Sequence, residues 1–203
     1  MQKMPLVNIP YFFGIIEDVD NELIAEQITK FGEPVGDGSH PLDDQAVNDG
    51  DILLPDSSEI NELLLQLTRL VQYAAEKQEL TLKSQWAVSL KEGRSVGPHS
   101  HHANYHMYPE DYWSAVYYPI ADESSAPLIL SATWCNVVNR QARIQPQTGM
   151  YVIFPAYIQH WTTRQTSPEP RLVIGANFDP VEPNTAPNVD FSIYDRRPPI
   201  EPS

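Results

Sequence analysis

The sequence has little cysteine, little positive charge and no long apolar run, and each shortage excludes a class of protein. Cys135 is the only cysteine in 203 residues, so an internal disulfide and a thiolate metal site are both excluded. Lysine and arginine number 13 against 27 acidic residues; the net charge of −14 leaves no basic surface for nucleic acid. No apolar run approaches the roughly 18 residues of a membrane-spanning helix. We therefore expect a cytoplasmic protein that binds neither nucleic acid nor membrane.

The length fits one domain, residues 1–203, with a core of ordinary size. Three regions follow from the residue patterns: a helical support region over 1–80, a β core over 81–179, and a tail over 180–203. The tail holds six of the 19 prolines, a density that excludes a helix or a central strand there. Assembly into a homo-oligomer stays open.

Two helices are expected in the first third. Asp20 can cap a helix whose apolar residues run from Leu23 to Phe31 and which ends at Gly32. Asp56, with Glu59 three positions on, is the expected start of a longer helix. The apolar stripe of this second helix would be Ile60, Leu63, Leu64, Leu67, Val71 and Ala74.

From Thr81 onwards the apolar residues alternate with polar ones, as they do in strands. Short strands separated by turn residues, with no helix between them, predict an antiparallel sandwich or barrel. The fold class is therefore mainly β with N-terminal helices (α+β). The expected strands are 82–90, 113–118, 128–132, 150–154, 160–163 and 171–178.

The most informative feature is a group of histidines. Residues 99–106 hold four of the six, and His160 follows an apolar run that ends at Pro155. Because His99 and His101 are two residues apart, a strand would place both imidazoles on one face. With His160 as a third ligand from a distant strand, one metal ion could be held with its opposite side open for a substrate.

Several motifs then resemble those of bacterial and phage 2-oxoglutarate/Fe(II) oxygenases. They are Trp86–Gly93, Pro98-His99-Ser-His101, Ser114–Tyr118, Gly149–Pro155 followed by His160, and Arg171–Asn177, in the order and spacing of that family. The resemblance covers roughly residues 82–179. It implies a double-stranded β-helix, the jelly-roll of cupin-like enzymes, supported by about two helices.

The resemblance also implies roles for single residues. His99 matches the proximal iron ligand and His160 the distal one. Arg171 matches the basic residue that binds the far carboxylate of 2-oxoglutarate through its guanidinium fork. Asn177 and Tyr118 would face the same cavity and contact this cosubstrate.

Position 101 departs from the family pattern, which has Asp or Glu in the second ligand position. His101 is the first choice for this ligand, because one strand can position both members of an H-x-H pair. A longer loop before Trp113 offers His106, Glu110 or Asp111 instead.

The cofactors implied are Fe(II) and 2-oxoglutarate, with nickel or zinc as substituted metals, and the reaction is hydroxylation of a small-molecule or peptide substrate. Trp86, Trp113, Trp134 and Trp161 are candidates to line the site, although packing explains at least two of them. Two alternatives remain. One is a cupin-like three-histidine dioxygenase or isomerase without 2-oxoglutarate, and the other is a non-catalytic jelly-roll module with a closed four-ligand metal shell.

Overall fold

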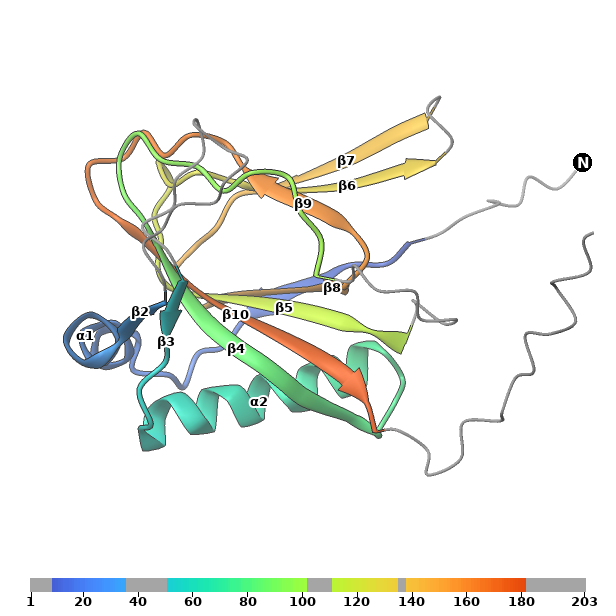
Figure 1. Ribbon diagram of the computed structural model, residues 1–203, viewed down its shortest axis with the longest axis horizontal. Coiled ribbons are helices and arrows are strands. Elements are labelled where there is room, and N and C mark those ends of the chain that lie inside the picture. The colour runs from blue at the N-terminus through green and yellow to red at the C-terminus, as the bar shows by residue number, and fades with distance from the viewer. Residues whose placement is uncertain (1–8, 36–50, 102–110, 135–137, 182–203) are drawn as a thin grey trace, which may run out of the picture.

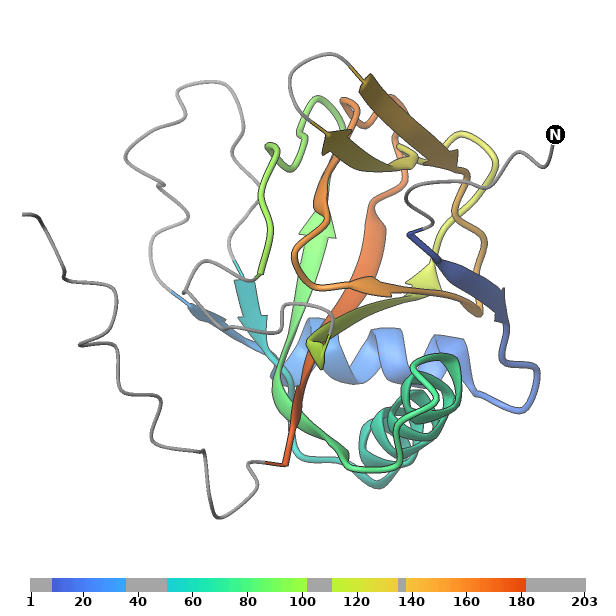
Figure 2. The same cartoon turned by 90° about the vertical axis from the view of Figure 1, so that its right-hand side faces the viewer.

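The computed structural model describes residues 9–35, 51–101, 111–134 and 138–181. Two antiparallel sheets face each other, and two helices cover the outer face of the larger sheet (Figure 1). The view turned by 90° shows both helices beneath the same sheet (Figure 2). The predicted class, mainly β with two N-terminal helices, is confirmed.

The first helix begins and ends where the sequence predicts. Helix α1 (Asn21–Phe31) has Asp20 as its N-cap, and this carboxylate accepts a hydrogen bond of 3.0 Å from the Leu23 N–H. Gly32 ends the helix, and its N–H donates to the Ile28 carbonyl.

The second helix begins one residue later than predicted. Helix α2 (Ser58–Ala74) is capped by Ser57, whose hydroxyl accepts from the Ile60 N–H at 3.2 Å. Asp56 lies outside the helix, and its carboxylate accepts from the Asn61 side chain instead. Ser57 lies three residues before Ile60, the spacing at which an N-cap side chain reaches a free N–H of the first turn. The predicted stripe is confirmed, since Ile60, Leu63, Leu64, Leu67 and Val71 are all buried.

The strands form one large and one small antiparallel sheet. The large sheet has the order β1 (Phe12–Ile15), β8 (Met150–Pro155), β5 (Trp113–Ile120), β10 (Arg171–Pro180), β4 (Leu80–Leu90), β3 (Asp51–Leu53) and β2 (Glu33–Val35). The small sheet has the order β7 (Val138–Ile144), β6 (Leu128–Trp134) and β9 (Gln159–Thr162).

Four of these strands were not predicted, namely β1, β2, β3 and β7. Strands β2 and β3 have three residues each, too few to show an alternation. Pro34 is tolerated in β2 because this strand is the edge of the sheet. The region 1–80 is therefore not purely helical, since it adds strands to both edges of the large sheet.

Alternation along the strands divides the apolar residues between two cores. One core lies between the large sheet and the helices, and Ile174 and Ala176 of β10 belong to it. The other contains Val173 of β10 with Val88 and Phe154, together with residues of the small sheet, and it lies between the two sheets. The core between the two sheets supports the candidate site.

In the described part of the chain, no helix combines the length and apolar character that crossing a membrane requires. Of the predicted proline-rich tail, all but residues 180 and 181 lies outside the described residues.

Candidate metal centre

The candidate site is built where the loop after β4 meets β9. His99 and His160 form an isolated antiparallel bridge, in which each N–H donates to the other residue's carbonyl, at 3.0 and 2.8 Å. The His101 N–H donates to the Ala156 carbonyl at 3.1 Å, which fixes the backbone at the second position. The H-x-H segment is thus held as an added partner of the small sheet.

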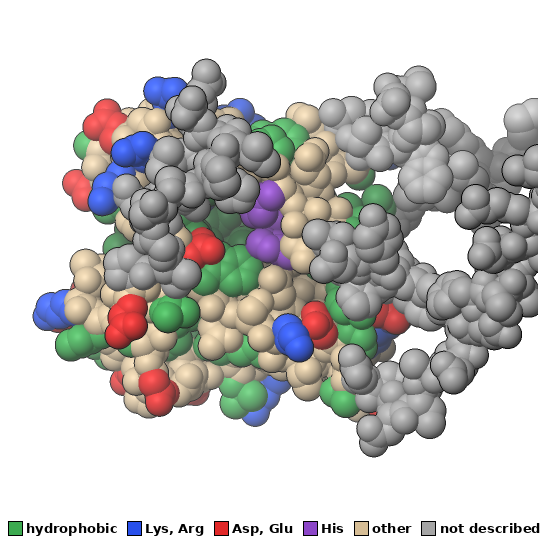
Figure 3. Space-filling view, in the orientation of Figure 1, with side chains coloured by type: hydrophobic (Ala, Val, Ile, Leu, Met, Phe, Trp, Pro, Cys, Tyr) green, Lys and Arg blue, Asp and Glu red, His purple; other side chains and the backbone are tan. Residues whose placement is uncertain are grey.

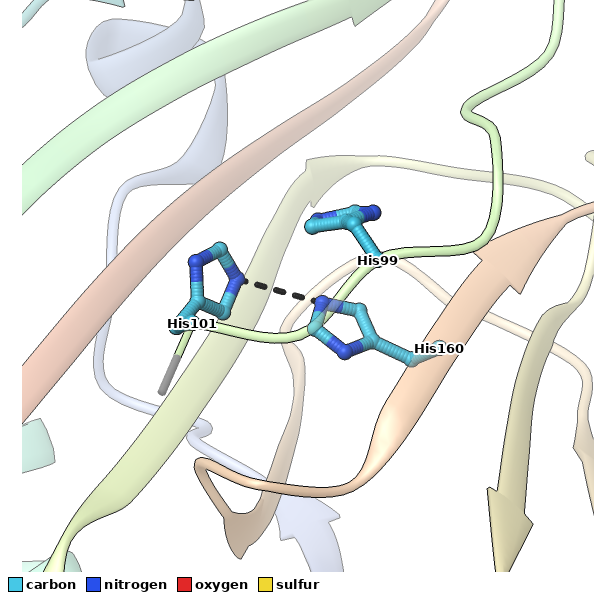
Figure 4. A group of neighbouring side chains, drawn as sticks. All are labelled: His99, His101 and His160. Carbon is cyan, nitrogen blue, oxygen red and sulfur yellow. Dashed lines mark hydrogen bonds between the residues drawn. The ribbon is translucent and has the colours of Figure 1, made fainter. Parts of the chain in front are cut away.

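Three imidazoles converge at this bridge (Figure 4). One ligand nitrogen from each of His99, His101 and His160 lies within 4.8 Å of the other two. The Nε2 atoms of His101 and His160 are 3.1 Å apart, and the His99 ring centroid lies 4.2 Å from that of His160. Three convergent nitrogens at this spacing can close around one cation.

Backbone carbonyls orient two of the rings. Nδ1 of His99 lies 2.8 Å from the Gly97 carbonyl, and Nδ1 of His160 lies 3.0 Å from the Ile158 carbonyl. Because a carbonyl can only accept, each Nδ1 carries the proton and each Nε2 keeps its lone pair. This is how metal-binding histidines are usually held.

Burial keeps the deeper imidazoles neutral. Desolvation, and then the nearby His99, lowers the pKa of His101 to about 4. The same two causes, desolvation first, lower the pKa of His160 to about 3. At neutral pH both rings are therefore neutral imidazoles, each with one unprotonated nitrogen.

Aromatic side chains border the cluster. The rings of Phe154 and His160 meet edge-on with centroids 4.8 Å apart, and Trp86 lies tilted against His101 at 4.9 Å. Of the four tryptophans considered, Trp86 lies at the site, whereas Trp113 packs in the core between sheet and helices. The side chain of Trp134 lies outside the described residues.

Arg171 is a buried guanidinium with unused hydrogen-bonding capacity. Its side chain is 2% exposed, its Nη1 donates to the Ala126 carbonyl at 2.6 Å, and its Cζ lies 5.5 Å from the centre of the Tyr118 ring. Its Nε has no hydrogen-bond partner in the part of the chain that the structure describes. Among the described residues no carboxylate forms an ion pair with it. Burial lowers the pKa of this group, as expected for a cation without a counter-charge.

Asn177 lies on the inner face of β10 in a polar row across three strands. Its Oδ1 accepts from the Ser114 hydroxyl at 2.8 Å, and its Nδ2 donates to the Ser84 hydroxyl at 3.3 Å. After these two bonds the Asn177 amide still has one N–H hydrogen and one oxygen lone pair for a further partner. A contact of Asn177 with the cosubstrate stays a prediction.

The alternative second ligands are not part of the cluster that the structure describes. His106 and Glu110 lie outside the described residues. Asp111 is described, and its carboxylate pairs with the Lys77 ammonium. Among the described residues His101 is therefore the side chain that accompanies His99 and His160.

Sequence reasoning missed Asp51. In β3 it stands opposite Val88 of β4. Desolvation raises the pKa of its carboxyl, and the nearby His99 opposes this rise. A strand of three residues carries no pattern from which this placement could be predicted.

Comparisons by sequence and by structure give different results. No family model and no curated protein matches the chain by sequence. Solved structures do match. The carbocyclase SnoK from nogalamycin biosynthesis, a non-heme alpha ketoglutarate dependent enzyme, has a TM-score of 0.62 at 12% identity, covering 96% of this chain and 90% of its own.

Two further matches have similar scores. A Pseudomonas putida prolyl-4-hydroxylase has a TM-score of 0.59 at 15% identity, covering 85% of this chain and 93% of its own. HygX from Streptomyces hygroscopicus, with nickel, 2-oxoglutarate and hygromycin B bound, has a TM-score of 0.60 at 13% identity, covering 85% and 84%. The chain therefore has the double-stranded β-helix fold of the 2-oxoglutarate/Fe(II) oxygenases, as the sequence resemblance predicts.

Proposed function

We propose that this protein is a 2-oxoglutarate- and Fe(II)-dependent oxygenase that hydroxylates a small-molecule or peptide substrate. The observation that carries the proposal is the convergence of His99, His101 and His160 at one end of a barrel whose interior also holds the Arg171 guanidinium. Fold alone does not determine activity, so the proposal depends on these side chains.

The donor set fits the metal. Three neutral imidazole nitrogens suit Fe(II), and they suit nickel or zinc as substitutes, whereas calcium and magnesium prefer oxygen ligands. When bound, Fe(II) together with 2-oxoglutarate supplies the oxidation of a substrate C–H bond by dioxygen. His99, His101 and His160 would hold the ion.

The buried arginine fits the cosubstrate. A guanidinium with an unpartnered Nε and no carboxylate counter-charge among the described residues is suited to bind a carboxylate from a ligand. Arg171 would hold the far carboxylate of 2-oxoglutarate, with Tyr118 beside it. The apolar side chains around Phe154 and Val173 would keep water away from this end of the barrel.

The test is a binding measurement without oxygen. Protein loaded with Fe(II) should develop a visible charge-transfer band when 2-oxoglutarate is added. Arg171→Met keeps most of the apolar stem but removes the charge, so it should weaken the band while the iron content stays unchanged. Arg143→Met, on the exposed face of β7, is the matched control and should leave the band intact.

A second candidate function is favoured by one observation, the absence of a carboxylate from the described cluster. Three-histidine sites also belong to cupin-like dioxygenases or isomerases that use no 2-oxoglutarate. Bound iron without a band in wild-type protein would favour this reading. A tightly bound zinc ion with four protein ligands would favour the non-catalytic module instead.

A further inference from the structure

Strand β3 places a carboxylate beside the histidine cluster. In the antiparallel pair of β3 and β4, Asp51 stands opposite Val88 and Ile52 opposite Ala87. Directly opposed residues point to the same face of a sheet. Val88 belongs to the core between the two sheets. Ala87 and Ile52 belong to the core between the large sheet and the helices. The Asp51 side chain therefore lies on the inner face of the large sheet, on the strand next to the edge strand β2.

On this face Asp51 lies near His99 of the candidate site. His99 is close enough to act electrostatically on the Asp51 carboxyl, and it is the most exposed of the three histidines. Figure 3 shows histidine side chains at the wall of a recess, next to apolar side chains and with an acidic side chain across from them.

Among the described residues no lysine or arginine forms an ion pair with the Asp51 carboxylate. The ion pairs of the described residues join Lys30 to Glu26 and Lys77 to Asp111, and neither involves Asp51. An exposed carboxylate that takes part in neither of these ion pairs can bind a cationic ligand.

Trp86 adds an aromatic surface on the same face. It precedes Val88 by two residues on β4, so both side chains point inward. Its indole lies across Gly175, where an added Cβ would stand 2.6 Å from the ring, and it is tilted against His101. An aromatic ring close to a carboxylate is a common arrangement for binding an ammonium group.

We infer that the substrate is a cation, an amine-bearing or guanidinium-bearing molecule whose positive group binds Asp51 while Trp86 packs against it. This inference rests on the proposed function, because it places the substrate next to the metal centre of that enzyme. The net charge of −14 also favours the approach of a cation. Two sources of the cationic group are possible: a small amine molecule, or a basic side chain of a peptide.

The experiment measures binding of matched probes by tryptophan fluorescence, on metal-free protein and on anaerobic protein loaded with Fe(II) and 2-oxoglutarate. Nα-acetyl-lysine amide is the cationic probe, Nα-acetyl-norleucine amide its uncharged counterpart, and cadaverine the small free amine. We expect both cations to bind more tightly than the norleucine probe, and Asp51→Asn to weaken cation binding by about tenfold without affecting the uncharged probe. The tighter of the two cations identifies the source of the group.

Asp18→Asn is the control variant. It removes the same charge from the exposed connection between β1 and α1, on the helix side of the large sheet, and should change no affinity. Equal affinity of wild type and Asp51→Asn for both cations would overturn the inference, as would an equal loss in the control. Weaker iron binding by Asp51→Asn with unchanged cation affinity would also overturn it, because Asp51 would then balance the charge of the metal.

The two proposals fail separately. If cations bind through Asp51 but 2-oxoglutarate gives no charge-transfer band, the cation site stands and the oxygenase does not. If the band appears but cation affinity does not depend on Asp51, the oxygenase stands without this substrate class.

Discussion

His99 and His160, which are far apart in the chain, exchange two backbone hydrogen bonds and so bring their imidazoles together. The ring centroids are 4.2 Å apart, and the two bonds of the bridge itself join main-chain groups. The site is therefore largely preorganised by backbone pairing, and a metal ion need not order the loop as it binds.

Removing either imidazole should remove the metal but not the fold. In His99→Ala and in His160→Ala the backbone bridge can persist, since it uses only N–H and carbonyl groups. Loss of one of three ligands should lower iron affinity by more than about 100-fold, a larger effect than the loss of an outer hydrogen bond. Iron content after anaerobic reconstitution and desalting measures this, with circular dichroism as the check of folding.

His102→Ala is the internal comparison for these variants, because His102 is the next residue after the H-x-H pair and does not belong to it. We expect its iron content to equal that of wild type. Equal iron in all three variants would mean that the histidines which converge here are not the ligands.

The pH dependence of stability should report on the buried histidines. An unfolded histidine binds a proton near pH 6.5, whereas folding lowers the pKa of His101 to about 4 and that of His160 to about 3. Between these limits the unfolded chain holds more protons, so the free energy of unfolding falls as the pH falls. Above pH 6.5 both states hold neutral imidazoles and this contribution is constant.

The expected slope is about 1.4 kcal/mol per pH unit for each histidine between pH 6 and 4.5. Urea unfolding of metal-free wild type and of His160→Gln at several pH values measures it, and the difference between the two curves removes the contribution of carboxylates. The wild-type curve should be the steeper one. Parallel curves would show that His160 is not held neutral by burial.

The helices and the longer strands of the large sheet could be predicted because their patterns repeat over many residues. The stripe from Ile60 to Val71 and the alternation around Val88 are of this kind. Strand β3 could not be predicted, since three residues show no period and it is their pairing with β2 and β4 that makes them a strand. Asp51 was missed for the same reason.

The candidate site also has a part that the sequence predicts and a part that it does not. His99, His101 and His160 are recognisable as an H-x-H pair with a distant partner, and the structure brings all three together. The carbonyls of Gly97 and Ile158 that orient two rings are main-chain groups, to which no side-chain type points. A sequence read by side chains alone therefore shows the ligands of such a site but not what holds them.

The corrected start of α2 leads to a stability prediction. Ser57→Ala removes the hydroxyl that accepts from the Ile60 N–H and should destabilise the protein by about 1 kcal/mol. Asp56→Ala removes a bond to an exposed side chain, and its effect should be within about 0.5 kcal/mol. Thermal or urea unfolding of both variants measures the difference. A larger loss in Asp56→Ala would restore Asp56 as the cap.

Gly175 and Trp86 give a prediction that joins stability to the site. In Gly175→Ala the new methyl group would stand 2.6 Å from the indole, so the ring must turn away or the strands must separate. Crowding of this kind typically costs about 1–3 kcal/mol. Because the same indole lies against His101, iron affinity and tryptophan fluorescence should change together with stability.

Gly93→Ala is the control: its backbone φ of +80° strains an alanine, but nothing lies within 4 Å of the added methyl group. That variant should lose stability without altering iron affinity. Equal iron affinity in Gly175→Ala and wild type would show that Trp86 does not help to position His101.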